Sequence, residues 1–126
     1  MKAIRRYIRI SSKKVNLVAD LVRGKSVEDA LNFLMFVPKH SAKPLYDTIK
    51  SAAANAEQNF KQNQKDLYVS KIVVNEGSTL KRQRPVSRGR SHPIRKHTSH
   101  ITVEVAVRTE PVQKTVKKKI VQTSTT

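Results

Sequence analysis

The strongest chemical signal in the sequence is the segment from Ser78 to His100, which is rich in cations and contains no Asp or Glu. Only Leu80, Val86 and Ile94 in it are aliphatic, so it cannot supply a hydrophobic core. A guanidinium group binds phosphate oxygens through two parallel N–H bonds and also stacks on bases. The segment therefore predicts contact with a polyanion, through Lys81, Arg82, Arg84, Arg88, Arg90, Arg95 and Lys96.

The same segment holds three histidines, His92, His97 and His100, whose spacing raises the question of a metal. The neighbouring Lys and Arg side chains would repel a cation, and no thiolate or nearby carboxylate completes a ligand set. Contacts to phosphates or base edges suit these rings better, so we predict no metal site.

Further cations lie before this segment, in places where regular structure would align them. A strand would present its arginines in a row, where they could contact phosphates. For the cations at the two ends of the helix that follows, phosphate contact and simple exposure to solvent are both open interpretations. The candidates are Arg5, Arg6 and Arg9 on the strand, Lys13 and Lys14 at the helix start, and Arg23 and Lys25 at its end.

The composition excludes several classes of protein. The chain has 126 residues, a formal net charge of +17 and no Cys, which removes disulfides, cysteine zinc sites and cysteine nucleophiles. It has no Gly-rich phosphate loop, no Gly-x-Ser-x-Gly and no His-Glu-x-x-His. Its acids are scattered, and Glu28-Asp29 is the one adjacent pair. We expect no enzyme, no cofactor and no small-molecule substrate.

A membrane is the second polyanion to consider. No apolar run approaches the ~18 residues of a spanning helix, and the N-terminus has no uninterrupted apolar stretch after its charges. The long helix expected from Ser41 to Phe60 balances Lys43 and Lys50 against two acids, so it lacks a cationic face for a lipid surface. We therefore expect nucleic acid as the partner, no membrane, and a cytoplasmic location.

Hydrophobic periodicity predicts the order strand, three helices, strand, basic segment, strand. Apolar residues repeat every three or four positions in the helices, and β-branched residues dominate the last two strands. The strands are expected at 3–10, 67–75 and 101–107, and the helices start after Ser11 or Ser12, at Ser26 and at Ser41.

The expected faces follow from the same periods. Alternation in the first strand places Ile4, Ile8 and Ile10 with Arg6 on one face. The helix stripes comprise Val15, Leu17, Val18, Leu21 and Val22 in the first helix; Val27, Ala30, Leu31 and Leu34 in the second; and Leu45, Ile49, Ala52, Ala53, Ala56 and Phe60 in the third.

This order predicts an α+β fold, with an antiparallel sheet that carries its helices on one face. The last two strands flank the basic segment, so a long hairpin with its turn near Arg88-Gly89-Arg90 is the simplest connection. An arm of 17 residues, from Val69 to Pro85, would span up to ~55 Å. Residues 1–110 are expected to form one domain, followed by a basic, disordered tail at 111–126.

Three segments together resemble the bacterial large-subunit ribosomal protein of the twenty-second family. They are RYIRISSKKVNLVADLVRGKSVEDALNFL, SAAANAEQNF and EGSTLKRQRPVSRGRSHPIRKHTSHITVEV, and the resemblance covers about residues 3–110. Two departures stand out. Ser11-Ser12-Lys13-Lys14 replaces the family's frequent Ser-Pro-Arg/Lys-Lys, and the chain continues past Glu110.

The resemblance implies three helices on a small three-stranded antiparallel sheet with a long protruding hairpin at about 76–102. It also implies binding to several domains of 23S-type ribosomal RNA beside neighbouring large-subunit proteins, and help in subunit assembly. The hairpin would line the nascent-peptide exit tunnel, with Arg88, Gly89 and Arg90 at its tip near the macrolide site. Lys81, Arg82 and Arg84 would lie in or near the tunnel wall.

Other nucleic-acid modules fit the sequence less well. An RNA recognition motif needs stacking aromatics on its sheet, and the characteristic Lys/Arg-Gly-Phe/Tyr motif is absent. In a helix-turn-helix the recognition helix would be SVEDALNFLMF, whose acids would be repelled by a major groove. The remaining alternative is a free-standing basic RNA-binding module outside the ribosome.

Overall fold

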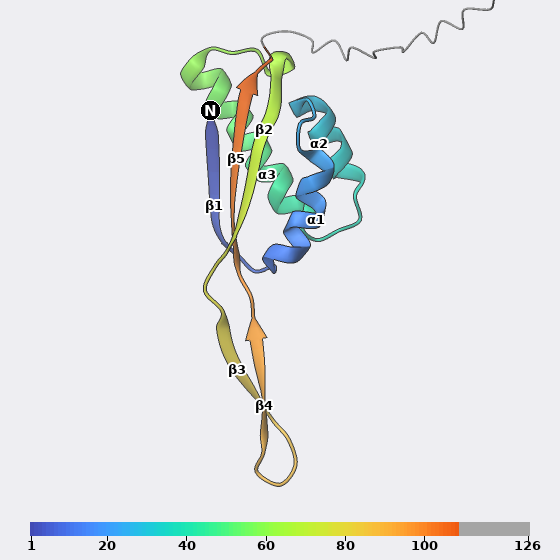
Figure 1. The fold of residues 1–126 in the computed structure, drawn as a ribbon, viewed down its shortest axis with the longest axis vertical. Coiled ribbons are helices and arrows are strands. Elements are labelled where there is room, and N and C mark those ends of the chain that lie inside the picture. Colours follow the sequence, from blue (N-terminus) through green and yellow to red (C-terminus); the bar gives the residue numbers. More distant parts are fainter. Residues whose placement is uncertain (109–126) are drawn as a thin grey trace, which may run out of the picture.

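The computed structural model describes residues 1–108, so the predicted tail at 111–126 lies outside the described residues. Three helices cover one face of a sheet, and a two-stranded arm projects from one end of the body (Figure 1). The elements are β1 (Lys2–Ile8), α1 (Ser12–Val22), α2 (Val27–Phe36), α3 (Ala42–Phe60), a 3₁₀ turn (Gln64–Asp66), β2 (Leu67–Glu76), β3 (Leu80–Pro85), β4 (Ser91–Lys96) and β5 (Ser99–Val107).

The body sheet has the order β1-β5-β2, with both pairs antiparallel, which confirms the predicted α+β class. The last strand in sequence is thus the central strand in space. Its alternating Ile101, Val103 and Val105 are each no more than 1% exposed, because the helices cover that side of the sheet. The period-2 pattern of the sequence therefore identified the strand that holds the core.

Strand β1 does not follow the simple alternation expected from its sequence. Ala3 faces the core and Ile4 is 48% exposed, while Ile8 and Ile10 are buried as predicted. The register with β5 shifts between Arg5 and Ile8, and Tyr7 adopts a positive φ of 56°. A bulge inserts an extra residue and reverses which face follows, so the predicted grouping of Ile4 with Ile8 was wrong.

The helix stripes are correct in their centres and wrong at three positions. Leu17 and Leu21 of α1 are 71% and 47% exposed, and Phe60 at the end of α3 is 58% exposed. The body covers a narrower arc of α1 than the sequence pattern suggested. The buried arc consists of Val15, Val18, Ala19 and Val22.

Helix α3 packs against its neighbours through small side chains. Ala52, Ala53 and Ala56 are buried along it, and these small side chains let the neighbouring β1 and β5 approach closely. Ser41 is the N-cap of α3, where the sequence predicted that the helix starts, yet its hydroxyl does not cap the helix. It instead donates to the Lys14 carbonyl at 3.3 Å, which ties the start of α3 to α1.

The start of α2 offers a test of stability. The Ser26 Oγ accepts a hydrogen bond from the Asp29 N–H at 3.1 Å and donates to the Asp29 carboxylate at 2.6 Å. We expect Ser26→Ala to lower the free energy of unfolding by about 1 kcal/mol, because an orphan N–H loses its partner. Urea denaturation measures this. Ser11→Ala is the matched control, since the N-cap Ser11 of α1 makes no side-chain cap bond; equal losses in the two variants would contradict the assignment.

Candidate nucleic-acid interface

The arm leaves the body through a tight neck between β2–β3 and β4–β5. The Gly77 N–H donates to the Thr98 carbonyl at 2.9 Å, and the buried Thr98 hydroxyl donates to the Ser78 carbonyl at 2.6 Å. A Cβ atom placed at Gly77 would lie 2.5 Å from Thr98 Oγ1 and 3.1 Å from His100 Cε1. Real Cβ atoms essentially never approach another heavy atom within 3.0 Å, so a side chain at this position would have to displace the Thr98 hydroxyl, and the neck favours glycine for lack of space.

Beyond the neck, the arm is a ribbon of exposed side chains. Strands β3 and β4 pair from Leu80 with Lys96 to Pro85 with Ser91, which places Lys81 directly opposite Arg95. Like charges opposite one another destabilise an antiparallel pair, and an isolated two-stranded ribbon is marginal in water. No Asp or Glu lies on the arm to offset this repulsion.

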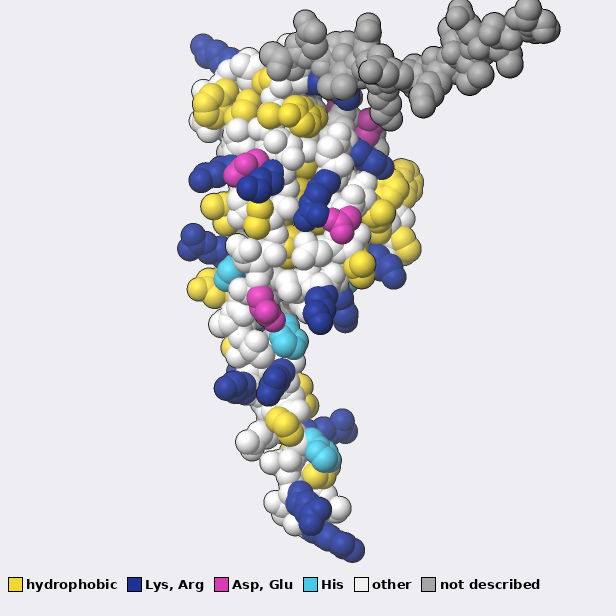
Figure 2. All heavy atoms as spheres, in the orientation of Figure 1, with side chains coloured by type: hydrophobic (Ala, Val, Ile, Leu, Met, Phe, Trp, Pro, Cys, Tyr) yellow, Lys and Arg dark blue, Asp and Glu magenta, His cyan; other side chains and the backbone are white. Residues whose placement is uncertain are grey.

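The turn of the arm forms where the sequence predicted it. Arg88 and Gly89 both adopt positive φ values, of 60° and 67°, and the Val86 N–H donates to the Arg90 carbonyl at 2.9 Å. Glycine takes this left-handed conformation without steric cost. The result is a reversal that exposes two arginine side chains at the far end of the molecule (Figure 2).

The arginines in β1 and just after it are exposed but differ in their surroundings. Arg5 donates to the Asp47 carboxylate of α3 at 2.8 Å, in an ion pair whose side chains are about half exposed. Arg6 and Arg9 are exposed near the bulge. A phosphate at Arg5 would therefore compete with an internal carboxylate, whereas no ion pair forms at Arg6 or Arg9 within residues 1–108.

The two ends of α1 are also different. Lys13 and Lys14 lie in the first turn, which contains no acid, so their charges add to the positive end of the helix dipole. An anion there would relieve this repulsion. At the other end, Arg23 donates to Asp20 and to the Ile72 carbonyl of β2 at 3.0 Å, and the Lys25 ammonium lies 4.3 Å from the centre of the Phe33 ring.

The structure separates the three predicted histidines. His92 lies on the arm opposite Arg84. The His97 Nδ1 is 3.7 Å from the Glu76 carboxylate at the neck. The His100 Nδ1 accepts the Tyr7 N–H at 3.0 Å, and the two rings meet edge to face. Residues 1–108 contain no group of three His, Cys, Asp or Glu that could hold a metal.

The structure also brings together residues that the sequence did not single out. Lys39 and His40, in the connection between α2 and α3, join Arg9, Lys14, Lys96 and His97 around a cleft of about 780 Å³ beside the neck. A basic pair between the helix-ending Pro38 and the N-cap Ser41 was the available signal. The sequence did not show that this basic pair lies beside the arm, because the tertiary fold brings the two together.

The charges as a whole favour nucleic acid. Lys and Arg side chains are distributed over the visible face of the body and the arm, with few Asp or Glu side chains between them (Figure 2). No helix among the described residues is long and apolar enough to cross a membrane.

Comparison with known proteins is consistent with a basic surface that binds nucleic acid. The family model of ribosomal protein L22p/L17e matches residues 3–106. "Large ribosomal subunit protein uL22" of Desulfitobacterium hafniense (strain Y51) is 51% identical over 109 residues, covering 86% of this chain and 96% of that protein. The same-named protein of Ligilactobacillus salivarius (strain UCC118) is 51% identical over 107 residues, covering 85% and 93%. The chain therefore belongs to the ribosomal protein L22p/L17e family.

Proposed function

We propose that this structural, non-enzymatic protein of the large ribosomal subunit works by binding 23S-type ribosomal RNA across several of its domains, and that this binding aids subunit assembly. The observation that carries the proposal is the arm. It has no core, its opposed cations repel, and it carries no acid. Phosphates from RNA segments that surround the arm would neutralise it on both faces.

The body would add contacts of graded strength. Arg6, Arg9, Lys13 and Lys14 lie exposed near the neck end and form no ion pair within the described chain, so we assign them direct phosphate contacts. We expect smaller contributions from the cations already engaged in internal contacts, which are Arg5, Arg23 and Lys25. The basic surface would then touch RNA on several sides.

We further propose that the arm lines the nascent-polypeptide exit tunnel, with Arg88, Gly89 and Arg90 at its tip. What supports this is its shape together with the family membership: a thin, exposed, basic ribbon suits a narrow passage walled by RNA. Residues 1–110 would act as one RNA-binding domain beside neighbouring large-subunit proteins, with 111–126 as a basic extension.

Sedimentation and salt titration test the RNA-binding proposal. We expect the protein to remain with large subunits through high-salt washing. For the purified chain, log affinity for large-subunit RNA should fall by roughly 0.7–0.9 per log unit of salt for each phosphate contact. A free-standing RNA-binding module would instead be recovered only in the unassembled pool, and a flat salt dependence would contradict phosphate contact.

A further inference from the structure

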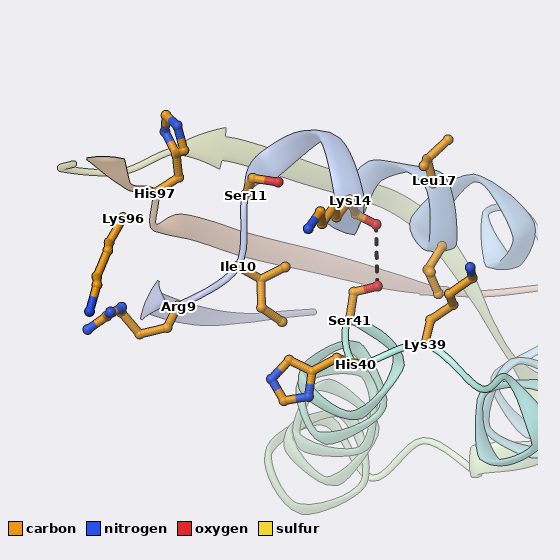
Figure 3. Close-up of a pocket in the computed structure, with 11 residues that line it drawn as sticks. Arg9, Ile10, Ser11, Lys14, Leu17, Lys39, His40, Ser41, Lys96 and His97 are labelled. Atoms are coloured by element: carbon orange, nitrogen blue, oxygen red, sulfur yellow. Dashed lines mark hydrogen bonds between the residues drawn. The ribbon is translucent and has the colours of Figure 1, made fainter. Parts of the chain in front are cut away.

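The cleft beside the neck is formed by four separate segments (Figure 3). Arg9, Ile10 and Ser11 follow β1; Lys14, Leu17 and Val18 lie on α1; Lys39, His40 and Ser41 precede α3; and Lys96 and His97 end the arm. The 3.3 Å bond from the Ser41 hydroxyl to the Lys14 carbonyl joins two of its walls. At about 780 Å³, it falls within the ~300–1,000 Å³ range of small-ligand sites.

The rim of this cleft is strongly positive. Four cations and two histidines line it, and no Asp or Glu is among the lining residues. The N-terminus of α1 opens beside Ser11, whose hydroxyl makes no cap bond, so the helix dipole adds to the same field. Outside the lining, the Glu76 carboxylate lies 3.7 Å from the His97 Nδ1. The rim therefore favours an anionic ligand.

Part of the lining of the cleft is apolar, and a ligand that consisted only of a phosphate would make no use of this apolar surface. Ile10 and Val18 are buried beneath it, whereas Leu17 is 71% exposed. Leu17 lies outside the buried core and adds exposed apolar surface to the lining of the cleft, which a ligand with a flat apolar face would cover. A nucleobase on its sugar-phosphate combines both features, and His rings and Arg guanidinium planes are surfaces on which unstacked RNA bases stack.

We propose that this cleft holds a single unstacked nucleotide of the ribosomal RNA. The base lies against Leu17 and Ile10, with the His40 ring or the Arg9 guanidinium available for its other face. The flanking phosphates contact the ammonium groups of Lys14, Lys39 and Lys96. This inference rests on the proposed RNA-binding function and adds to it a base contact at a defined place.

The test compares two leucines on one helix. Leu17→Ser removes the apolar wall, and Leu21→Ser, one turn further along α1 and outside the cleft, is the matched control. Leu17 is 71% and Leu21 47% exposed, and neither is part of the buried core, so both variants should fold. With a transcript of large-subunit RNA as the probe, we expect Leu17→Ser to lose about tenfold in affinity, in the range of a stacked base, and Leu21→Ser to bind as the parent chain does.

Salt dependence separates the base contact from phosphate contacts. Leu17→Ser should lose the same factor at every salt concentration, because no charge is removed, whereas Lys14→Gln should reduce the salt slope by about one contact. If the parent chain binds with a steep slope but Leu17→Ser equals Leu21→Ser, the nucleotide site is refuted and RNA binding stands. If the parent chain itself fails to bind the transcript, both proposals fall.

Crosslinking provides a readout that does not depend on affinity. Assembled subunits that carry 4-thiouridine in their RNA are irradiated and digested, and the crosslinked peptides are identified by mass spectrometry. We expect peptides covering 10–18 or 39–43 to carry a nucleotide. Crosslinked peptides from the arm, with no nucleotide on 10–18 or 39–43, would overturn the proposal.

Discussion

Gly77→Ala is expected to lower the free energy of unfolding by about 1–3 kcal/mol, the usual cost of overpacking a filled site. The added methyl would lie 2.5 Å from Thr98 Oγ1, and that hydroxyl is buried and bonded to the Ser78 carbonyl. Room for the methyl would require the Thr98 hydroxyl to leave its hydrogen bond to Ser78. We expect RNA affinity to fall as well, because the arm would leave the body in a different direction. Urea denaturation and RNA titration measure the two effects.

Two comparisons identify the cause. Gly24 has a positive φ of 75° but nothing within 4 Å of an added Cβ, so Gly24→Ala reports backbone strain alone, about 1–2 kcal/mol, and should leave the arm undisturbed. Adding Thr98→Ala to Gly77→Ala removes the clashing oxygen, and a double-mutant cycle should show favourable coupling. A Gly77→Ala chain as stable as the parent would show that the neck is pliable.

Truncation of the arm should have the largest effect on RNA binding. We replace residues 81–95 by Asn-Gly, so that Leu80 and Lys96, which are already paired across the strands, close a two-residue turn. No buried core residue lies in the removed segment, so the urea midpoint should stay at that of the parent. The loss of six cations should reduce the slope of log affinity against log salt by up to about 5.

A second variant separates charge from shape. Replacing the same six arm cations by Gln retains the length of the arm and should lower the salt slope by the same amount. Its removal of the Lys81–Arg95 repulsion should also stabilise the free ribbon, which amide hydrogen exchange can detect. Loss of cooperative unfolding on truncation would show that the arm belongs to the core, and an unchanged slope would exclude phosphate contacts by the arm.

Local physics explains what the sequence predicted well. The start of α2 at Ser26 depends on a few neighbouring residues, so a short pattern sufficed to find it. The position of the arm followed from composition, since a segment with only three aliphatic residues cannot supply a core. The alternation of Ile101, Val103 and Val105 likewise identified the most buried strand.

Errors arose where tertiary structure decides. The bulge at Tyr7 changes the phase of β1, and nothing in an alternating sequence marks it. A helical stripe gives the direction of the buried face but not its width, so Leu17 and Leu21 were assigned to the core of α1. The width depends on which neighbours arrive, and here they leave both leucines uncovered.

The candidate interface also has a part that the sequence predicted and a part that it did not. The cations of the arm could be predicted because each is exposed wherever the arm points. The cleft could not, because Arg9, Lys39 and Lys96 come from distant parts of the chain. Equally, the bond from Arg23 to the Ile72 carbonyl became visible only once α1 was placed on β2.

The length of the arm converts a small rotation at the neck into a large displacement of the tip. Gly77 and Arg88 are separated by eleven residues, so at ~3.3 Å per residue the tip lies roughly 35 Å from its pivot. A tilt of 10° at the neck would sweep the tip through about 6 Å, more than the spacing between neighbouring strands. Two hydrogen bonds at the neck, and the lack of a Cβ atom at Gly77, thus determine the direction in which the whole arm projects. Small changes at the pivot act as large displacements at the far end.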